Sequence, residues 1–236
     1  MLAEFSRAAV TIALFGADTA HGARTVHPTI VIDAGHPSEV SSGAAVQNGT
    51  SEVHIAWEVA LRLARLLRGH GYTVVLTKPT ERTTVTNIDR ARTGNAAHAA
   101  LVVRLHCDAS GDSGYAIYHP DHQGTVHGRT GPSPSVMRAS AAAAESVHVS
   151  MSRLLAGKLK DGGVRGDSKT AIGERQGALT GSIFSDVPVV LIEMVTLSNP
   201  HDAGFIKEPR GQSLMAQAIA NGIGRYVPAS NSPRVR

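Results

Sequence analysis

Three apolar runs of this sequence end on side chains that bind metals or carry protons. The runs read TIVIDAGH, ALVVRLH and VPVVLIE, and their last residues are His36, His106 and Glu193. An apolar run rich in β-branched residues predicts a buried strand. Because open α/β sheets gather their chemistry at the carboxyl ends of strands, we expect the three side chains to share one sheet edge. Imidazoles and a carboxylate at one edge are what a hydrolytic metal site needs.

A fourth candidate, Glu52, opens the predicted helix 52–68 after the turn that starts at Asn48. The helix dipole stabilises a carboxylate in that position, and the side chain would project from the same sheet edge as the strand ends. We therefore expect Glu52 to reach the metal, whereas Glu39 stands too early in a loop to be placed. Two alternatives stay open here: Glu52 serves the helix dipole alone, or the neighbouring His54 is the ligand.

Strand and helix patterns alternate along the chain and position these residues. Predicted strands cover 29–33, 73–77, 100–105, 114–118 and 187–192. Predicted helices cover 52–68, 87–99, 136–160 and 214–226. Loops are predicted at 37–51 and 119–135, and 161–186 shows no clear pattern. The alternation predicts one α/β domain of the phosphorylase/hydrolase-like kind: a mostly parallel or mixed twisted sheet of about six strands with helices on both faces.

The composition narrows the classes of partner. The chain has 236 residues, a formal charge of +4 and 42% hydrophobic residues, of which few are aromatic. Its Lys and Arg residues are scattered, with no basic helix or aromatic stacking platform, so we expect no nucleic-acid partner. The single cysteine excludes an internal disulfide and a cysteine-based zinc knuckle. No apolar stretch is long enough to span a membrane.

The two ends of the chain differ from the middle. Residues 1–23 contain an apolar segment after Arg7 and a small-residue site near Ala20, as in a secretory signal. Glu4 and the shortness of the segment fit an N-terminal helix as the alternative. Export is the favoured interpretation. We expect the catalytic domain to cover 29–227 and residues 228–236 to form a flexible tail.

At this point the sequence resembles a known family. The motifs that carry the resemblance recur in order from about residue 29 to 226: IDAGH ending at His36, Gly43-Ala44, Glu52, Arg90 with Asn95, Leu105-His106, PVVLIE ending at Glu193, and Leu197-Ser-Asn. They are similar to the zinc-dependent N-acetylmuramoyl-L-alanine amidases, in their type 3 catalytic domain. Any one motif is weak, but the ordered set is specific.

The resemblance implies a site and a reaction. One zinc ion would be bound by His36, Glu52 and His106, and Glu193 would be the catalytic residue. The enzyme would hydrolyse the amide bond between N-acetylmuramic acid and the L-alanine of the stem peptide in bacterial peptidoglycan. It would act as a monomer in the periplasm or cell wall, and the resemblance leaves open whether an activator protein is needed.

Three positions depart from the family pattern. Pro37 replaces the usual glycine, RLHCD at 104–108 replaces Ser-Ile-His-Ala-Asn, and Val195-Thr196 replaces Gly-Phe. None removes a ligand, but all flank the groove that would grip the substrate. Two other functions remain as alternatives: a zinc exopeptidase that trims stem peptides, and a peptidoglycan-binding module without turnover.

The residues around the motifs carry further expectations. We expect Cys107 to pack as a small apolar side chain that points away from His106. Arg90 and Asn95 should hold their helix to a neighbouring loop. Asp33 is either a partner of the ligands or an acid that ends a strand.

The long segment 119–135 contains three histidines, His119, His122 and His127. They form either a second metal site or, more commonly for a loop, solvent-exposed side chains. This segment and the helix after it would also be able to gate the groove.

Overall fold

The computed structural model describes residues 27–229, so the predicted N-terminal segment 1–23 and residues 230–236 lie outside it. One six-stranded sheet forms its centre, in the order β4-β1-β5-β10-β6-β9. Its strands are β1 (Thr29–Ala34), β4 (Thr73–Leu76), β5 (Leu101–Asp108), β6 (Tyr115–His119), β9 (Asp161–Gly166) and β10 (Val189–Thr196). Only the β10–β6 pair of this sheet is antiparallel. The predicted mixed sheet of about six strands is confirmed.

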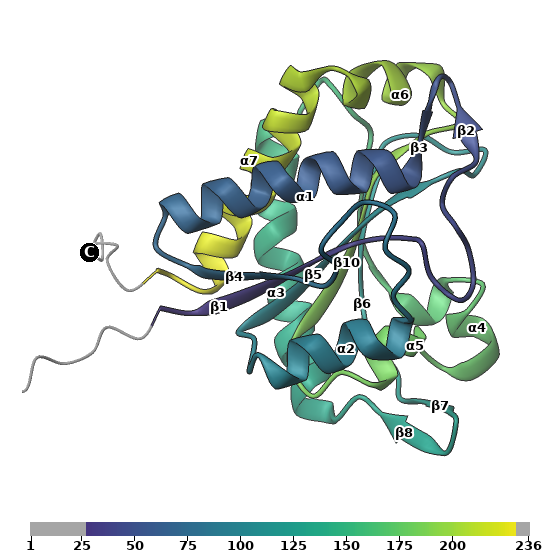
Figure 1. The fold of residues 1–236 in the computed structure, drawn as a ribbon, viewed down its shortest axis with the longest axis vertical. Coiled ribbons are helices and arrows are strands. Elements are labelled where there is room, and N and C mark those ends of the chain that lie inside the picture. The colour runs from purple at the N-terminus through teal and green to yellow at the C-terminus, as the bar shows by residue number, and fades with distance from the viewer. Residues whose placement is uncertain (1–26, 230–236) are drawn as a thin grey trace, which may run out of the picture.

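Helices cover both faces of the sheet (Figure 1). One face carries α1 (Glu52–Gly69), α3 (Pro134–Leu154) and α7 (Pro209–Tyr226). Helix α7 packs against both α1 and α3, while α1 contacts β5 and α3 contacts β6 and β10. The other face carries α2 (Asn87–Ala96). Gly94 brings α2 close to the sheet, because a Cβ at this glycine would lie 2.5 Å from Val102 Cγ2.

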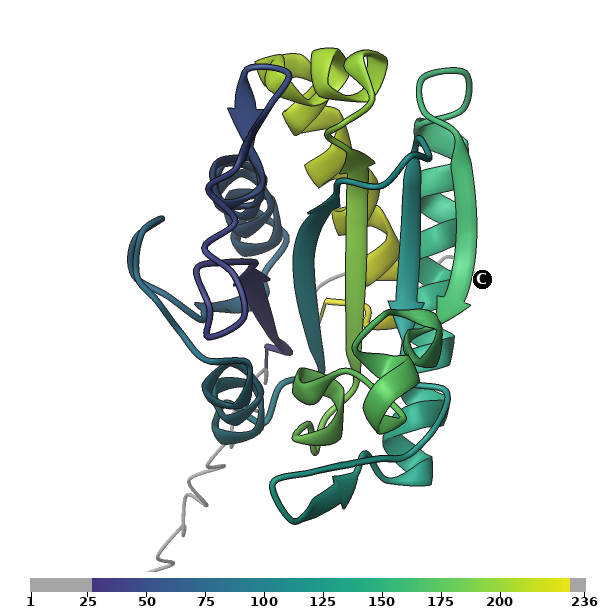
Figure 2. The same cartoon turned by 90° about the vertical axis from the view of Figure 1, so that its right-hand side faces the viewer.

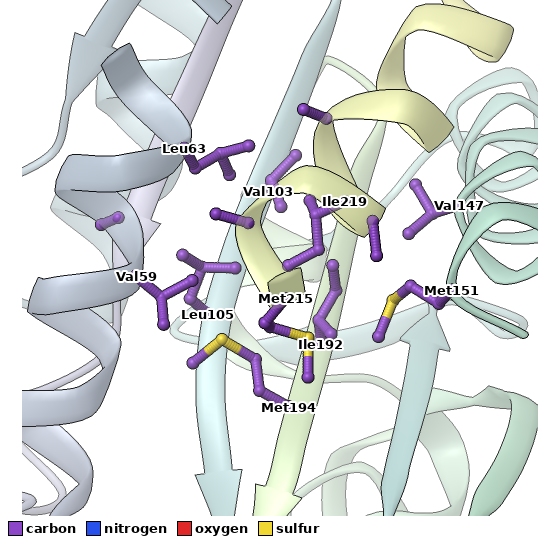
Figure 3. Packing of buried hydrophobic residues seen from close by; sticks show 14 of the residues in the cluster. Val59, Leu63, Val103, Leu105, Val147, Met151, Ile192, Met194, Met215 and Ile219 are labelled. Carbon is purple, nitrogen blue, oxygen red and sulfur yellow. The ribbon is translucent and has the colours of Figure 1, made fainter. Parts of the chain in front are cut away.

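The larger core lies between the sheet and the three-helix layer (Figure 3). Strand alternation sends Val103, Leu105 and Cys107 of β5 into this core. Val102 of the same strand joins a small cluster on the opposite face. Cys107 is 4% exposed and points away from the face that holds His106, as predicted.

Two short hairpins occupy segments predicted as loops. The first pairs β2 (Val46–Gln47) with β3 (Thr50–Ser51) through Asn48 and Gly49, which both have positive φ. Asn-Gly is the sequence typical of such a two-residue turn. The second pairs β7 (Gly124–Val126) with β8 (Arg129–Gly131). Figure 2 shows the two hairpins at opposite ends of the molecule.

Several helix boundaries differ from the sequence-based ones. The predicted helix 136–160 ends at Leu154, and Gly157 turns the chain with a φ of 69°. The predicted helix 87–99 ends at Ala96. Helix α6 (Pro200–Lys207) was not predicted, and α7 begins at Pro209 rather than at 214. Helices α6 and α7 each begin with a proline, whose fixed φ suits the first turn of a helix.

The segment without a clear pattern folds into short elements. After β9 come a 3-10 turn (Asp167–Lys169), α4 (Gly173–Gln176) and α5 (Thr180–Ile183). The hairpin β7–β8 packs against α4 and α5, and Figures 1 and 2 show these elements grouped at one end of the sheet. Elements of about four residues are too short to produce a helical period.

The chain stays packed beyond the predicted end of the domain. Tyr72 donates a hydrogen bond to the carbonyl of Val227 at 2.5 Å, and Ala229 is 7% exposed in the larger core. Ala229, which lies in the predicted tail, therefore packs against the domain. None of the helices in residues 27–229 has the length and apolar character needed to cross a membrane.

Candidate metal centre

His36 follows β1 in a left-handed backbone conformation, with a φ of 53°. Its Nδ1 donates to the carbonyl of Ser41 at 3.0 Å, which fixes the ring. The other nitrogen, Nε2, then faces Glu52 and lies 3.2 Å from Oε2. A neutral ring in this tautomer presents a lone pair to a carboxylate, so the contact is favourable only with a proton or a cation between the two atoms.

Glu52 takes the place beside β5 that β1 leaves open. Strand β1 ends at Ala34 while β5 continues to Asp108, so the amide of Cys107 has no strand partner on that side. Glu52 Oε1 accepts a hydrogen bond from this amide at 3.2 Å and lies 2.9 Å from His106 Nδ1. The start of α1 thereby delivers a carboxylate to both histidines.

The structure thus brings His36, Glu52 and His106 together. One ligand atom from each lies within 4.8 Å of the others, and this is the one such group of three within residues 27–229 that could hold a metal ion. The rival ligand His54 instead pairs with Glu81 at 3.3 Å, on the exposed side of α1.

His106 and Glu193 lie inside their strands, which corrects the prediction that they end them. Strand β5 runs on to Asp108 and β10 to Thr196, and the parallel register sets Glu193 directly beside His106. Neighbouring strands lie about 4.8 Å apart. The ladder becomes irregular immediately after Glu193. The fourth predicted residue is therefore a direct neighbour of the three-residue group.

Two atoms of this site have no hydrogen-bond partner. His106 Nε2 and Glu193 Oε2 are both buried and unpaired among the described residues. Burial raises the pKa of Glu193 well above its usual range, and the charges of Glu52 and Asp108 raise it further. A raised pKa makes the ionised carboxylate of Glu193 a stronger base, so that it can take a proton from water and pass it on.

The three grouped side chains differ in their charge. Burial opposes ionisation of Glu52, but hydrogen bonds and charge from both histidines outweigh it and hold its pKa well below the usual range. Burial also disfavours protonation of His36, yet Glu52 raises its pKa. At His106 burial prevails and lowers the pKa. An ionised carboxylate with two imidazoles, one of them carrying a buried unpaired nitrogen, is a donor set that fits a divalent metal such as zinc.

A buried ion network centred on Asp33 supports this site. Asp33 is fully buried, and its two carboxylate oxygens accept hydrogen bonds from Arg90, Arg104 and Thr77. Burial opposes its ionisation, but the charges of Arg104 and Arg90 hold the pKa of Asp33 well below its usual range. Of the two interpretations of Asp33, the structure favours a partner role, because Arg90 also binds the backbone that leads to His36.

The backbone around His36 is held by two cations. Arg90 donates to the carbonyls of Ala34 and Pro37, both at 2.8 Å, and so holds its helix to this loop as predicted. Lys78 is 2% exposed and donates to the carbonyl of His36. Burial and repulsion by Arg90 lower the pKa of Lys78 to about 8.

Two glycines leave room for the imidazole rings. A Cβ at Gly35 would lie 2.7 Å from His106 Cε1, and one at Gly43 would lie 2.5 Å from the His36 Cβ. Gly43 also has a φ of 63°, which side chains other than glycine rarely adopt. Both positions belong to the sequence motifs, and the structure gives the steric reason for them.

Hollows flank the site on two sides. One, of about 210 Å³, lies beside Glu52, and Ser41, Ser42, Gln47 and Asp108 are the other polar side chains in its walls. The second, of about 200 Å³, lies beside His106 and Glu193. Four aliphatic side chains form much of its wall: Val40, Ile172, Leu179 and Leu191.

The remaining candidates lie away from the site. Asn95 binds Phe184 and Asp186 through its side chain, so it joins α2 to the loop after α5. The three histidines of segment 119–135 do not converge on one point among the described residues. The groove wall comes from 170–180, and the hairpin within 119–135 packs behind it. Gating by that segment stays a prediction.

Sequence reasoning gave no role to Lys78 and treated Arg104 only as a departure from a motif. Each carried a signal. Arg104 stands inside a strand that is otherwise apolar, and Lys78 directly follows a strand. Charged residues in such positions are rarely buried without a partner.

Comparisons with known proteins agree with this geometry. A family model described as N-acetylmuramoyl-L-alanine amidase matches residues 30–225. The chain belongs to this family. A curated relative, the N-acetylmuramoyl-L-alanine amidase AmiC of Neisseria meningitidis serogroup B, is 25% identical over 227 residues. The match covers 86% of this chain and 53% of the relative, so the chain spans about half the length of that protein.

Solved structures of the family share the fold. The amidase Ami1 of Mycobacterium abscessus superposes with a TM-score of 0.71 at 21% identity, covering 84% of this chain and 98% of that one. The amidase AmiC2 of Nostoc punctiforme gives a TM-score of 0.68 at 23% identity, covering 84% and 96%. The mixed sheet and its two helical layers are thus those of amidase catalytic domains.

Proposed function

We propose that this protein is a zinc-dependent N-acetylmuramoyl-L-alanine amidase. It hydrolyses the amide bond between N-acetylmuramic acid and the first residue of the stem peptide in peptidoglycan. The observation that carries the proposal is the ionised Glu52 between two imidazoles, with the unpaired carboxyl of Glu193 beside them. Family membership, and the amidase names of the relatives, support this substrate.

The chemistry is divided between the metal ligands and Glu193. A zinc ion held by His36, Glu52 and His106 supplies Lewis-acid chemistry, which polarises a carbonyl and acidifies a water molecule. Glu193 accepts the proton of the attacking water at its unpaired Oε2 and passes it to the leaving amine. Its register position beside His106 keeps this oxygen next to the ligands.

The position of Glu52 at the helix start serves the same reaction. Its two oxygens face different histidines, so one carboxylate fixes the distance between the two rings. The ring centroids of His36 and His106 lie 5.1 Å apart with planes at 80°, so the rings face the site from different directions. Three protein ligands would leave the fourth position of a tetrahedral zinc site open for water or a carbonyl oxygen.

The cellular location that we propose follows from the substrate. Peptidoglycan lies outside the cytoplasmic membrane, so we propose that the protein works in the periplasm or cell wall. We also propose that it acts as a monomer; the described domain by itself provides His36, Glu52, His106 and Glu193. The formal charge of +4 favours contact with anionic wall polymers.

The test is a digest of purified peptidoglycan with the zinc-loaded protein. We expect soluble stem peptides with a new N-terminal L-alanine, and no release after chelation of the metal. Glu193→Ala should abolish release, and Glu145→Ala, which removes an exposed carboxylate of α3, should not. Activity that survives both complete metal removal and Glu193→Ala would refute the mechanism.

The same digest separates the alternatives. Release of free amino acids, without the new L-alanine terminus, would indicate an exopeptidase. Retention on insoluble peptidoglycan without any soluble product would indicate a binding module.

A further inference from the structure

Arg104 offers an unused hydrogen-bond donor to the groove. It stands two residues before His106 on the same face of β5 and is 5% exposed. Its Nε donates to Asp33 at 2.9 Å and its Nη2 to Asn87 at 2.6 Å. Its Nη1 makes no hydrogen bond within residues 27–229, and it is not among the unpaired atoms that are sealed from solvent. Arg104 lines the hollow beside His106 and Glu193.

Arg104 also shares its buried anion with a second cation. Asp33 is one carboxylate shared by two guanidinium groups, those of Arg90 and Arg104. Arg90 directs its remaining donors to backbone carbonyls, including that of Val85 at 3.1 Å. Buried charges are costly unless they are paired. Nη1 of Arg104 is therefore a donor that the buried partners leave free, and the carboxylates of Glu39 and Glu193 also lie close enough to interact with the guanidinium.

The shape of the hollow directs a ligand to this donor. Its lining combines the four aliphatic side chains with Arg104, His106 and Glu193, in a volume of about 200 Å³. Gly181 of α5 makes space for the guanidinium, because a Cβ there would lie 2.8 Å from Nη1. A largely apolar hollow that contains a cationic donor suits a short peptide segment that carries a carboxylate.

We propose that Arg104 is a specificity residue that binds a carboxylate of the substrate peptide through Nη1. The inference rests on the proposed function and adds that the stem peptide lies in this hollow. Two residues along a strand span about 6.6 Å, and two residues of an extended peptide span nearly the same length. With the scissile bond at His106, Arg104 therefore reaches the α-carboxylate of the D-glutamate that follows L-alanine.

The hollow on the other side of the site fits the other half of the substrate. Its serine, glutamine and aspartate side chains suit the hydroxyl and acetamido groups of a sugar. The muramyl residue would lie there, beside Glu52, while the peptide lies beside Glu193. The two hollows thus give the substrate one direction across the metal site.

The test compares two substrates that differ in one group. N-acetylmuramoyl-L-alanyl-D-glutamate carries the free α-carboxylate, and N-acetylmuramoyl-L-alanyl-D-isoglutamine carries a carboxamide there. For the zinc-loaded protein we expect kcat/KM to be about tenfold higher or more for the carboxylate, because a charge-assisted hydrogen bond is stronger than a neutral one. Equal rates for the two substrates would overturn the inference and leave the proposed function intact.

Variants assign the preference to Arg104. Arg104→Gln should remove it, Arg104→Lys should restore part of it, and Gly181→Ala should weaken it by displacing the guanidinium. Arg90→Gln is the matched control, because it breaks the same ion network without facing the groove. It should lower stability but keep the preference. A preference that survives in folded Arg104→Gln, or that disappears in Arg90→Gln, would overturn the inference.

A binding experiment is independent of turnover. Two peptides are compared by calorimetry with the metal-free protein: L-alanyl-D-glutamate and L-alanyl-D-isoglutamine, each with its γ-carboxyl in amide linkage as in the stem. The first should bind about tenfold more tightly. If neither muramyl substrate is hydrolysed, the proposed function fails, while this binding preference still decides the role of Arg104. Should Arg104→Gln not fold, Gly181→Ala in the same assay decides it.

Discussion

Two groups of charged side chains share one end of the sheet, and only one of them contains buried atoms without a partner among the described residues. The supporting network consists of Asp33, Thr77, Arg90 and Arg104, and both oxygens of its carboxylate are hydrogen-bonded. The site cluster consists of His36, Glu52, His106 and Glu193, and it contains two buried atoms without a partner. Buried polar groups in proteins are almost always paired. The network therefore contributes to stability, whereas the site cluster gives up stability in order to bind and react.

The largest expected effect is on activity, at Glu193. Glu193→Gln keeps the shape of the side chain and removes the group that accepts a proton, so kcat should fall by about 10²- to 10⁴-fold. Stability should stay equal or rise, because the variant no longer buries an ionisable group. Kinetics on a soluble muramyl peptide and a thermal melt measure the two quantities. A variant that loses activity because it loses its fold would show that Glu193 belongs with the supporting network.

The opposite result is expected at Asp33. Asp33→Asn leaves two buried guanidinium groups without their anion, which should lower the free energy of unfolding by about 3–5 kcal/mol. Urea unfolding measures this loss. The control is Asp112→Asn, which breaks an exposed pair with Lys160 and should change the midpoint far less. An equal effect of the two substitutions would contradict the comparison between network and surface.

Most of the fold could be predicted because its long elements repeat a local pattern. The strands around Ile32 and Val103 are continuous apolar runs that are buried on both faces, the helix from Glu52 has a clear helical period, and the sheet follows from the alternation of strands and helices. The short elements between 167 and 183 have no such period, because tertiary contacts such as that between Asp167 and Leu179 hold them in place. Ends of elements were also inaccurate, since β10 continues to Thr196 through residues that pack as core.

The sequence indicated which residues form the site, but it did not indicate how they are arranged in space. His36, His106 and Glu193 stood out because polar residues followed apolar runs, and the structure brings them together with Glu52. The register that sets Glu193 beside His106 depends on the pairing of β5 with β10, which no local pattern encodes. The supporting role of Lys78 depends in the same way on chain segments that meet only in the fold.

The carboxyl group of Asp167 extends the comparison, because one of its oxygens is buried without a partner although it lies outside the site cluster. Asp167 is 1% exposed, its Oδ1 has no partner among the described residues, and its Oδ2 accepts a hydrogen bond from Leu179. Burial raises the pKa of Asp167 to about 6. A raised pKa means that its contribution to stability is complete at low pH and is lost as the pH rises through about 6.

We therefore expect the free energy of unfolding to fall by about 2–3 kcal/mol between pH 4 and pH 7 through this group. Asp167→Asn should reduce that fall by about the same amount, as measured by urea unfolding at several pH values. The slope that remains includes the contribution of Glu193, whose raised pKa acts in the same direction. Asp33→Asn should leave the slope in this range unchanged, because the lowered pKa of Asp33 places its own titration at more acidic pH. A fall as large in Asp167→Asn as in the parent protein would mean that other groups produce it.

The smallest effect is expected on zinc affinity at Gly35, whose backbone lies close to the ring of His106. Gly35→Ala would set a Cβ 2.7 Å from both His106 Cε1 and the carbonyl oxygen of Leu105, so the ring or the strand must shift. Because small displacements of ligands weaken metal sites, zinc affinity should fall by about 10- to 100-fold, as measured by competition with a chelator. Gly204→Ala is the matched control, since nothing lies within 4 Å of its added Cβ in α6. It should leave zinc affinity unchanged and stabilise the helix by up to about 1 kcal/mol. Unchanged zinc affinity in Gly35→Ala would mean that the site cluster adapts to a displaced His106 ring. Rigid packing would then be a property of the supporting network alone.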